Sequence, residues 1–198
     1  MQDRPVPLPD SQRAQRTEKH IAEGSSDVAR WSQPVNLATQ WDARAQRAAA
    51  FIPAGARVLD LGCGMMALRQ ALKPDCVYTP ADIVAREPGC LVVDLNRQEF
   101  PQGKYDWVTF LGVLEYIHDA GWPLRQARMA APNMLLTYCA DITRGAALAQ
   151  RRGMGWVNDF DVSAMREMIQ SSGWEIATEN VDKRGPHNHQ IMFVCRRT

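Results

Sequence analysis

Short apolar runs recur along the middle of the chain, and each is bounded by polar or turn-forming residues. Five of them have the length and character of strands, at residues 56–61, 75–81, 90–95, 106–112 and 133–140. Helix-like or loop segments separate consecutive runs. Near-continuous apolar strands joined by helical crossovers are typical of a parallel sheet that is covered on both faces.

The C-terminal part follows a different pattern. Residues 161–173 predict a helix with Asp161 as its N-cap and Gly173 just past its end. Two more strand-like runs follow, at 174–181 and 190–196, joined by a short polar loop. A connection that short cannot hold a helical crossover, so these two strands must be antiparallel. The whole pattern predicts an α/β fold with a mostly parallel seven-stranded sheet, an antiparallel C-terminal hairpin and helices on both faces.

The N-terminal part carries weaker signals. The proline-rich residues 1–12 predict a flexible tail. Residues 13–52 predict a helical lid or cap segment that is broken near Gly24. Its second helix is expected to begin at Asn36, a good N-cap. The apolar face of that helix is expected to hold Leu37, Trp41, Ala45 and Ala48, with Arg44 and Arg47 directed elsewhere. Residues 53–198 then form the main domain.

Composition narrows the class of protein. The hydrophobic content of 45% and the charged content of 23% are typical of a soluble globular domain. A net charge of +1 gives no reason to expect a nucleic acid or an acidic membrane as partner. The five cysteines form no CxxC pair, which indicates a reducing compartment rather than a disulfide scaffold or a zinc site. With no apparent secretory signal, we expect a cytoplasmic monomer or homodimer without a metal.

The stretch "RVLDLGCGMMAL" points to a ligand. Gly62 and Gly64 follow the first predicted strand directly and precede a predicted helix. Glycines let the backbone turn tightly and approach a ligand, and the N–H groups of a helix start favour a polar or anionic group. A nicotinamide dinucleotide is one possible ligand, because Ala67 completes a G-x-G-x-x-A pattern and Asp82 lies about 20 residues further on.

Four stretches, of which the first overlaps the glycine turn, together favour a different cofactor. "VLDLGCG", "YTPADI", "VVDLNRQEFP" and "YDWVTFLGVLEYIHD" occur in this order between residues 58 and 119. Together they resemble the motifs of the class I S-adenosylmethionine-dependent methyltransferases. The last resembles that family's "FDxVxxxxVLEHI" pattern, with Tyr116 in place of the commoner His. A dinucleotide enzyme needs neither the Asp before the glycines nor "GVLEYIHD", so the methyltransferase interpretation is preferred, and it implies a Rossmann-like fold.

The resemblance implies roles for particular residues. Asp60 would pair with the ammonium group of the cofactor, since a carboxylate in an apolar run is costly without a partner. Asp82 would hold the ribose hydroxyls, and Asp94 would accept from the adenine amino group. The full expected cofactor-binding set is Asp60, Gly62, Cys63, Gly64, Asp82, Ile83, Asp94, Leu95, Leu111 and Gly112. Met66 stands where the family often has a third glycine, and its side chain is expected to narrow the cofactor site.

The methyl acceptor should lie beyond the carboxyl ends of the parallel strands. His118, in the loop after the fourth strand, is the candidate general base because its intrinsic pKa lies near neutrality. A solvated turn histidine is the alternative. The expected substrate-binding residues are Tyr116, Trp156, His187 and His189, with Trp31 and Tyr138 as further walls. His187 and His189 have no third ligand nearby in sequence, so we expect either an acceptor-pocket edge or a plain surface loop.

These observations predict a methyltransferase that uses S-adenosylmethionine and acts on O or N of a small molecule. A carbohydrate or natural-product intermediate is the expected acceptor, by analogy with stand-alone proteins of this size. Two alternatives remain. One is a non-catalytic binding or partner subunit of the same fold, and the other is an NAD-dependent oxidoreductase.

Overall fold

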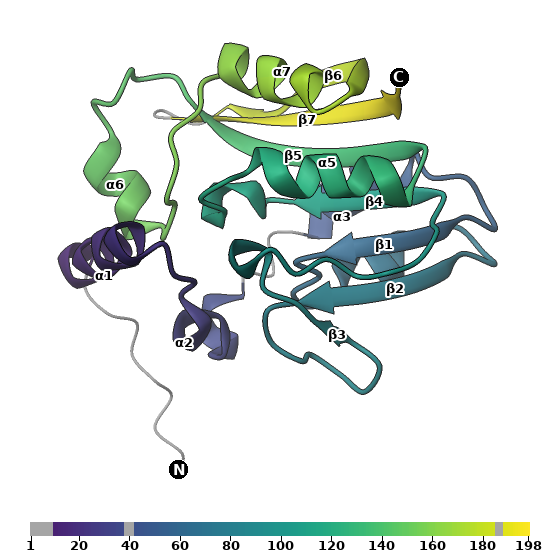
Figure 1. Ribbon diagram of the computed structural model, residues 1–198, viewed down its shortest axis with the longest axis horizontal. Coiled ribbons are helices and arrows are strands. Elements are labelled where there is room, and N and C mark those ends of the chain that lie inside the picture. Colours follow the sequence, from purple (N-terminus) through teal and green to yellow (C-terminus); the bar gives the residue numbers. More distant parts are fainter. Residues whose placement is uncertain (1–9, 38–41, 185–187) are drawn as a thin grey trace.

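The computed structural model describes residues 10–37, 42–184 and 188–198. Its centre is a seven-stranded sheet with the strand order β3-β2-β1-β4-β5-β7-β6 (Figure 1). The strands are β1 (Arg57–Leu61), β2 (Val77–Asp82), β3 (Leu91–Val92), β4 (Trp107–Leu111), β5 (Asn133–Asp141), β6 (Trp174–Arg184) and β7 (Asn188–Arg197). β1 to β5 run parallel, and β7 lies antiparallel between β5 and β6. The predicted Rossmann-like class I methyltransferase fold is confirmed.

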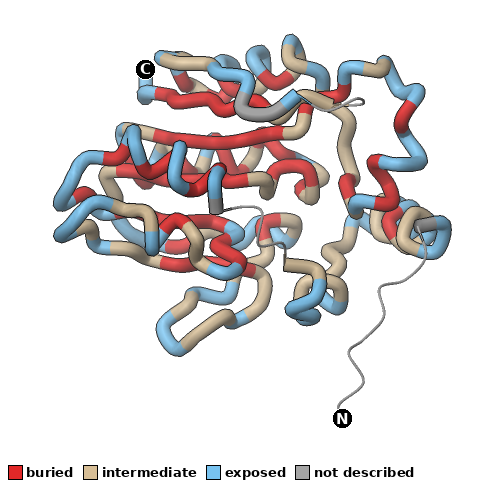
Figure 2. Tube along the Cα trace, turned by 180° about the vertical axis from the view of Figure 1, so that it is seen from behind, coloured by how far each residue is buried: buried red, intermediate tan, exposed pale blue. Residues whose placement is uncertain are grey.

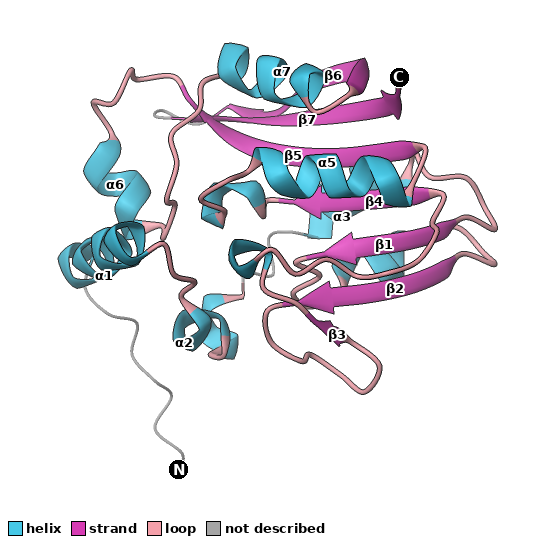
Figure 3. Cartoon of the chain, viewed as in Figure 1, coloured by secondary structure: helices cyan, strands magenta, loops and turns pink. Residues whose placement is uncertain are grey.

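Helices cover both faces of this sheet. The helices of the described residues, some of which lie beside the sheet, are α1 (Asp10–Glu23), α2 (Val28–Trp31), α3 (Asp42–Ala49), α4 (Ala67–Ala71), α5 (Gly121–Ala130), α6 (Leu148–Gly153) and α7 (Val162–Ser171). Short 3-10 turns lie at Pro34–Asn36, Leu95–Arg97 and Leu114–Tyr116. α5 and α7 pack on one face, and α3 and α4 on the other (Figure 3). Among the described residues, no helix has the length and apolar character needed to cross a bilayer.

The sheet separates two hydrophobic cores because successive strand residues point to opposite faces. In β1, Leu59 and Leu61 enter the core under α5 and α7, whereas Val58 enters the core under α3 and α4. β4 and β5 alternate in the same way, and Figure 2 shows their central stretches buried. Burying each large aliphatic side chain contributes roughly 1.5–3 kcal/mol, so these two cores hold the sheet and the helices together.

Residues 10–37, which we call the N-terminal segment, lie outside these layers. α1 packs against α6, and the Thr17 hydroxyl donates a buried hydrogen bond of 2.7 Å to the Arg152 carbonyl oxygen. An ion pair between Arg16 and Asp27 joins α1 to the start of α2. The segment therefore lies beside the carboxyl ends of the parallel strands (Figure 1).

Several expectations for the N-terminal part are corrected. α1 begins at Asp10, so residues 10–12 are helical rather than part of a tail, and residues 1–9 lie outside the described residues. Asn36 closes a 3-10 turn instead of capping a helix, and its amide donates to the Arg30 carbonyl oxygen at 2.7 Å. The second helix begins only at Asp42, and Trp41 lies outside the described residues.

Arg44 is also placed differently from the prediction. Ala45 and Ala48 are buried as expected, but Arg44 is only 9% exposed. Residues four apart share a face of a helix, so Arg44 follows Ala48 toward the interior. The sequence pattern placed Ala45 and Ala48 correctly, but Leu37 lies before the helix in an extended conformation, and Arg44 belongs to the buried face.

The remaining elements differ from the predictions mainly at their ends. β3 keeps only Leu91–Val92, because Asp94 leaves the strand and caps a 3-10 turn through the Asn96 N–H at 3.0 Å. The helix after Asp161 is confirmed: Asp161 accepts from the Ala164 N–H, and Gly173 has φ +84° just past the helix end. α6 was not predicted, because it is short and its Ala147 N-cap supplies no side-chain hydrogen bond.

Candidate active site

The glycine turn after β1 has the tight geometry that only glycine supports. Gly62 and Gly64 adopt positive φ values of +70° and +51°. A Cβ atom on Gly62 would lie 2.4 Å from Val113 Cγ2, which is closer than real Cβ contacts. The Gly64 N–H donates to Asp82 Oδ2 at 2.9 Å, so the turn is attached to the end of β2.

A cavity of about 300 Å³ opens at the carboxyl ends of β1, β2 and β4. That volume falls at the lower end of the range typical of small-molecule sites. All of the expected cofactor-binding residues line it, namely Asp60, Gly62, Cys63, Gly64, Asp82, Ile83, Asp94, Leu95, Leu111 and Gly112. The structure thus gathers at one place residues that the sequence distributes over four separate stretches.

Asp60 is a buried carboxylate held by two hydroxyl groups. Tyr78 Oη and Thr109 Oγ1 each donate to it at 2.6 Å, from the two strands that flank β1. Burial raises the pKa of Asp60 to about 6, although the two hydroxyl donors oppose the shift. The nearby Asp82 charge raises this pKa further, and the Arg44 charge lowers it. Asp60 is therefore ionised at neutral pH at an energetic cost, and a cation in the cavity would relieve that cost.

Both carboxylate oxygens of Asp82 accept hydrogen bonds from other parts of the chain. Its Oδ1 accepts from Arg86 Nη2 at 2.9 Å in a buried ion pair, while its Oδ2 accepts from the glycine turn. The Arg86 guanidinium also donates through Nη1 to the Trp31 carbonyl oxygen at 2.8 Å. Arg86 was missed in the sequence, where the only signal was its position four residues after Asp82. It connects the N-terminal segment to the cavity wall.

Asp94 makes a second connection to the N-terminal segment. Its Oδ1 accepts from Ser26 Oγ at 2.7 Å as well as from the Asn96 N–H at 3.0 Å. The Asn96 side-chain amide donates to Ser26 Oγ at 2.8 Å and to the Tyr116 carbonyl oxygen at 3.0 Å. These contacts join the loops after β3 and β4 to Ser26 of the N-terminal segment.

The structure does not bring His118 to the cavity. Its Nε2 lies 3.2 Å from the Ser25 carbonyl oxygen, and its ring borders a second, shallower depression beside Phe160 and Met168. The position therefore gives no support to the role of base. His20 lies on the cavity wall instead, with Nδ1 2.8 Å from Ser25 Oγ and Nε2 3.7 Å from Asp27 Oδ1. No sequence signal distinguished His20 from a solvated helix residue.

Tyr116 and Trp31 form an aromatic part of the wall. Their ring centroids lie 4.8 Å apart in an edge-on arrangement. Burial raises the pKa of Tyr116 to about 12, the Glu115 charge raises it further, and the Arg30 charge lowers it in part. The phenol therefore stays protonated at neutral pH and acts as a hydrogen-bond donor rather than a base.

Trp156 supports this aromatic part from behind. Its Nε1–H donates to Tyr116 Oη at 3.2 Å, and its ring lies under the Arg151 guanidinium, 4.7 Å from Cζ. Trp156 is buried and is not among the residues that line the cavity, although its neighbours Gly155 and Val157 are. It positions Tyr116 and does not itself form the wall that we expected.

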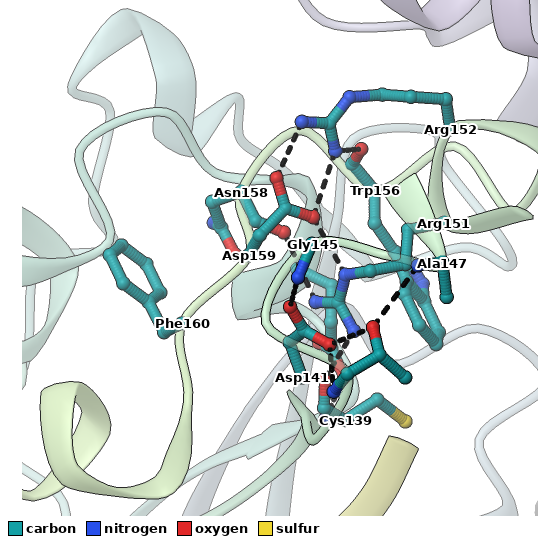
Figure 4. Close-up of polar contacts among 12 residues, drawn as sticks. Cys139, Asp141, Gly145, Ala147, Arg151, Arg152, Trp156, Asn158, Asp159 and Phe160 are labelled. Carbon is teal, nitrogen blue, oxygen red and sulfur yellow. Dashed lines mark hydrogen bonds and ion pairs between the residues drawn. The ribbon is translucent and has the colours of Figure 1, made fainter. Parts of the chain in front are cut away.

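A buried network fixes the segment from α6 to Phe160 (Figure 4). Asp159 accepts from Arg151 Nε at 2.6 Å and from Arg152 Nη1 at 3.0 Å. Arg151 Nη1 donates to the Cys139 carbonyl oxygen at 3.0 Å, and Arg152 Nη1 donates to the Trp156 carbonyl oxygen at 2.8 Å. The network holds residues 155–157 against the carboxyl end of β5, where they close one end of the cavity.

The other expected wall residues lie elsewhere. Tyr138 is buried in the core, and its hydroxyl donates to Asn158 Oδ1 at 2.6 Å. His189 pairs with Ala140 in the β5–β7 ladder and does not line the cavity. His187 lies outside the described residues. Within the described ranges, no group of three or more His, Cys, Asp or Glu side chains is arranged to hold a metal ion.

Met66 has a left-handed backbone conformation, which glycine adopts more readily than other residues. It adopts φ 55° and ψ 36° at the start of α4. The cavity wall includes Met65 but not Met66, so the expected narrowing of the site by Met66 is wrong. Methionine at this position raises the conformational energy of the backbone and does not fill the cavity, because left-handed φ values are unfavourable for residues with a Cβ atom.

Arg44, which was expected to point away from the apolar face of its helix, and Arg30, for which the sequence made no prediction, also line the cavity. Arg44 lies against Gly112, where an added Cβ atom would come 2.4 Å from Arg44 Nη1. Arg30 lies against Gly155, where an added Cβ atom would come 3.1 Å from Arg30 Cζ. Both glycines have positive φ values, and the two guanidinium groups lie directly beside them on the wall.

The strand order, the glycine turn and the acids after β2 and β3 define a class I methyltransferase fold. A family model described as a methyltransferase domain matches residues 35–179. The chain therefore belongs to the methyltransferase-domain family. No curated protein matches it in sequence.

Solved structures of methyltransferases share this fold. The mitomycin 7-O-methyltransferase has a TM-score of 0.66 and 20% identity, over 96% of this chain and 69% of that chain. The magnesium protoporphyrin IX methyltransferase of Synechocystis PCC 6803, solved with S-adenosylhomocysteine, gives 0.62 and 17%, over 96% and 100%. The 1,6-didemethyltoxoflavin-N1-methyltransferase of Burkholderia thailandensis, solved with its substrate and S-adenosylhomocysteine, gives 0.60 and 17%, over 98% and 93%.

Proposed function

We propose that this protein transfers a methyl group from S-adenosylmethionine to an oxygen or nitrogen atom of a small molecule. The observation that supports this most strongly is the convergence of four separate sequence stretches on one cavity at the carboxyl edge of the sheet. Ligands of open parallel sheets bind at this edge. The alternatives of an NAD-dependent oxidoreductase and a non-catalytic subunit have no comparable structural support.

The residues of the cavity fit the cofactor. Asp60 is a buried anion whose ionisation is costly until a cation such as the cofactor's ammonium group arrives. Asp82 and Asp94 offer carboxylates to the ribose and the adenine amino group, between the apolar side chains of Ile83 and Leu95. Arg44, whose charge acts on Asp60, is the group that we assign to the cofactor's carboxylate. When bound, the cofactor supplies an electrophilic methyl group.

The contribution of the chain itself is mainly alignment. Holding an acceptor atom in line with the methyl group lowers the barrier by roughly 7–11 kcal/mol in favourable cases. We propose that residues 13–52 act as a lid over the domain at 53–198, which the contacts of Ser26 with Asp94 and of Trp31 with Arg86 support. A closed lid excludes water and fixes the acceptor. Tyr116 stays protonated at neutral pH, so it donates a hydrogen bond and does not remove a proton from the acceptor.

The acceptor class is proposed by analogy. The similar structures include enzymes named for mitomycin and for a toxoflavin precursor, which supports a natural-product intermediate as the acceptor. We further propose a cytoplasmic protein, as a monomer or homodimer. The five cysteines, all of them free thiols, support a reducing compartment.

Calorimetry with S-adenosylhomocysteine and NAD, side by side, tests the proposed function. S-adenosylhomocysteine should bind, and at a concentration of about 100 Kd it should stabilise the protein by about 2.7 kcal/mol. For a chain of this length, that corresponds to a rise in Tm of about 5–11 °C. Binding of NAD alone would favour the oxidoreductase, and binding of neither would favour the non-catalytic subunit. A labelled cofactor incubated with pooled metabolites then identifies the acceptor.

A further inference from the structure

Arg30 is a cation on the cavity wall that has no counter-ion among the described residues. Its Nε is buried and makes no hydrogen bond, and no carboxylate of the described ranges pairs with its guanidinium group. Asp27, the acid nearest to it in sequence, pairs with Arg16 and accepts a hydrogen bond from the backbone N–H of Arg30 itself. The guanidinium is supported only by the Trp31 ring, 5.4 Å from Cζ, and by the backbone of Gly155.

Other arginines at this edge of the sheet do pair with a carboxylate. Arg86 pairs with Asp82, and Arg151 and Arg152 both pair with Asp159. Withdrawing a guanidinium group from water is costly unless a carboxylate or a set of acceptors replaces the water. Arg30 is half-buried and pairs with no carboxylate among the described residues, so its guanidinium group is available to an anion that enters the cavity.

Tyr116 supplies a second donor beside Arg30. Its oxygen accepts from Trp156 Nε1, so its own O–H proton is free, and no acceptor in the described part of the chain receives it. The Arg30 charge acts on this phenol, and the Trp31 ring contacts both side chains. Two donors and an aromatic ring thus face the same part of the cavity, next to residues 155–157.

We propose, on the basis of the proposed function, that the methyl acceptor carries an oxyanion that Arg30 and Tyr116 bind. The planar guanidinium fork matches a carboxylate or a phosphate, and a neutral hydroxyl adds a further hydrogen bond to either. Trp31 gives the acceptor a flat apolar surface. The anion anchors the acceptor while another oxygen or nitrogen receives the methyl group. The cofactor's own carboxylate is assigned to Arg44, which lies against Gly112 and whose charge acts on Asp60.

Calorimetry on the protein saturated with S-adenosylhomocysteine tests this inference. The probes are benzoate, phenyl phosphate and the neutral benzamide. We expect at least one anion to bind at millimolar concentrations, and Arg30→Gln to weaken it at least about tenfold, as loss of a charge-assisted hydrogen bond should. Tyr116→Phe should weaken it less. The preferred anion then distinguishes a carboxylate from a phosphate.

The matched control is Arg125→Gln, which removes an exposed arginine that pairs with Asp119 outside the cavity. It should leave anion binding unchanged, and all three variants should bind S-adenosylhomocysteine within about threefold of the wild type. The inference is overturned if benzamide binds as tightly as the anions, if Arg30→Gln binds them normally, or if neither anion binds. Failure of the wild type to bind S-adenosylhomocysteine would instead overturn the proposed function, and this inference with it.

Discussion

Asp60 illustrates how a binding residue can weaken the fold that carries it. Its carboxylate is buried in the sheet, and two hydroxyl groups and a distant arginine only partly replace the water that it has lost. The raised pKa measures this deficit, because each pKa unit corresponds to about 1.4 kcal/mol. A cationic ligand would repay the deficit on binding, so the same residue couples cofactor affinity to pH.

Asp60→Asn is expected to stabilise the free protein at neutral pH. The pKa of Asp60 rises from 3.8 in the unfolded chain to about 6 in the folded protein, so the folded state binds the proton more tightly. Stability is therefore lost as pH rises from about 4 to about 6, and the full cost, on the order of 3 kcal/mol, is present above that range. After allowing for weaker hydroxyl contacts, urea unfolding at pH 7 should show a gain of about 1–2 kcal/mol.

The gain should disappear near pH 4, and the same variant should bind S-adenosylhomocysteine at least about tenfold more weakly. In the wild type, binding should weaken as pH falls below about 6, because Asp60 becomes protonated. Asp106→Asn is the matched control, since Asp106 is an exposed acid whose pKa is lowered by its hydrogen bonds to Arg57. An equal loss of stability for Asp60→Asn at both pH values would contradict this account.

Met66 and Gly62 test the two ways in which a glycine position can matter. Met66→Gly should leave the Kd of S-adenosylhomocysteine within about threefold, because Met66 does not line the cavity and the change relieves a left-handed backbone. Gly62→Ala should lower the free energy of unfolding by roughly 1–3 kcal/mol and weaken binding, since its Cβ would collide with Val113. Calorimetry and urea unfolding measure both. A larger binding loss for Met66→Gly than for Gly62→Ala would refute the placement of Met66.

Site residues were predictable from the sequence where local chemistry marked them. The glycines and acids of the cavity lie near the carboxyl ends of apolar strands, and the resemblance to the methyltransferase motifs selected them. Arg30, Arg44 and Arg86 were not predictable in this way. A charged residue is normally solvated, and these three are wholly or partly buried because segments distant in sequence, such as Gly155 and Trp31, cover them.

At the scale of elements, the N-terminal segment depends on a few polar contacts rather than on a hydrophobic core. Thr17 bonds the backbone of α6, Ser26 bonds Asp94, and the Trp31 carbonyl oxygen accepts from Arg86. Elements held by few buried apolar contacts open locally at low free energy. Such a segment is suited to admit the cofactor and the acceptor and then to close over them.

Thr17→Val should loosen this segment without unfolding the domain. The substitution removes the buried hydroxyl bond to Arg152 and leaves its carbonyl oxygen without that partner, at a cost of about 1–3 kcal/mol. Hydrogen exchange in α1 should accelerate, S-adenosylhomocysteine should dissociate faster, and exchange in β1 and β4 should not change. Glu18→Gln is the control, because its exposed ion pair with Arg152 should contribute little. Equal acceleration in the sheet would show that α1 is part of the cooperative core.

Elements were predictable in proportion to their regularity. The strands and α7 carry periodic apolar positions and clear caps, and the structure confirms them. α6 and the 3-10 turn at Pro34–Asn36 are short, and tertiary contacts such as the Asp159 network determine their conformation. β3 ended early for a similar reason, because the local hydrogen bond of Asp94 competes with the ladder.

At the scale of the whole molecule, the fold is a complete layered domain to which the N-terminal segment is attached. Neither hydrophobic core contains a described residue before Ala45. The strand directions could be expected from the connections alone, since helical crossovers indicate parallel strands and the last short connection requires an antiparallel pair. The placement of the N-terminal segment could not, because it rests on side-chain contacts between residues far apart in the sequence.

Deletion of residues 1–33 tests whether the N-terminal segment serves ligand binding rather than the stability of the layered domain. Because both cores remain intact, the shortened chain should unfold cooperatively with a Tm within a few degrees of the full-length protein. It also loses the contacts of Ser26 with Asp94 and of the Trp31 carbonyl oxygen with Arg86, so its affinity for S-adenosylhomocysteine should fall at least about tenfold. Anion binding should vanish with Arg30. If the shortened chain instead lost its cooperative transition, the N-terminal segment would belong to the folding unit, and its contacts with Asp94 and Arg86 would serve stability rather than closure of the cavity.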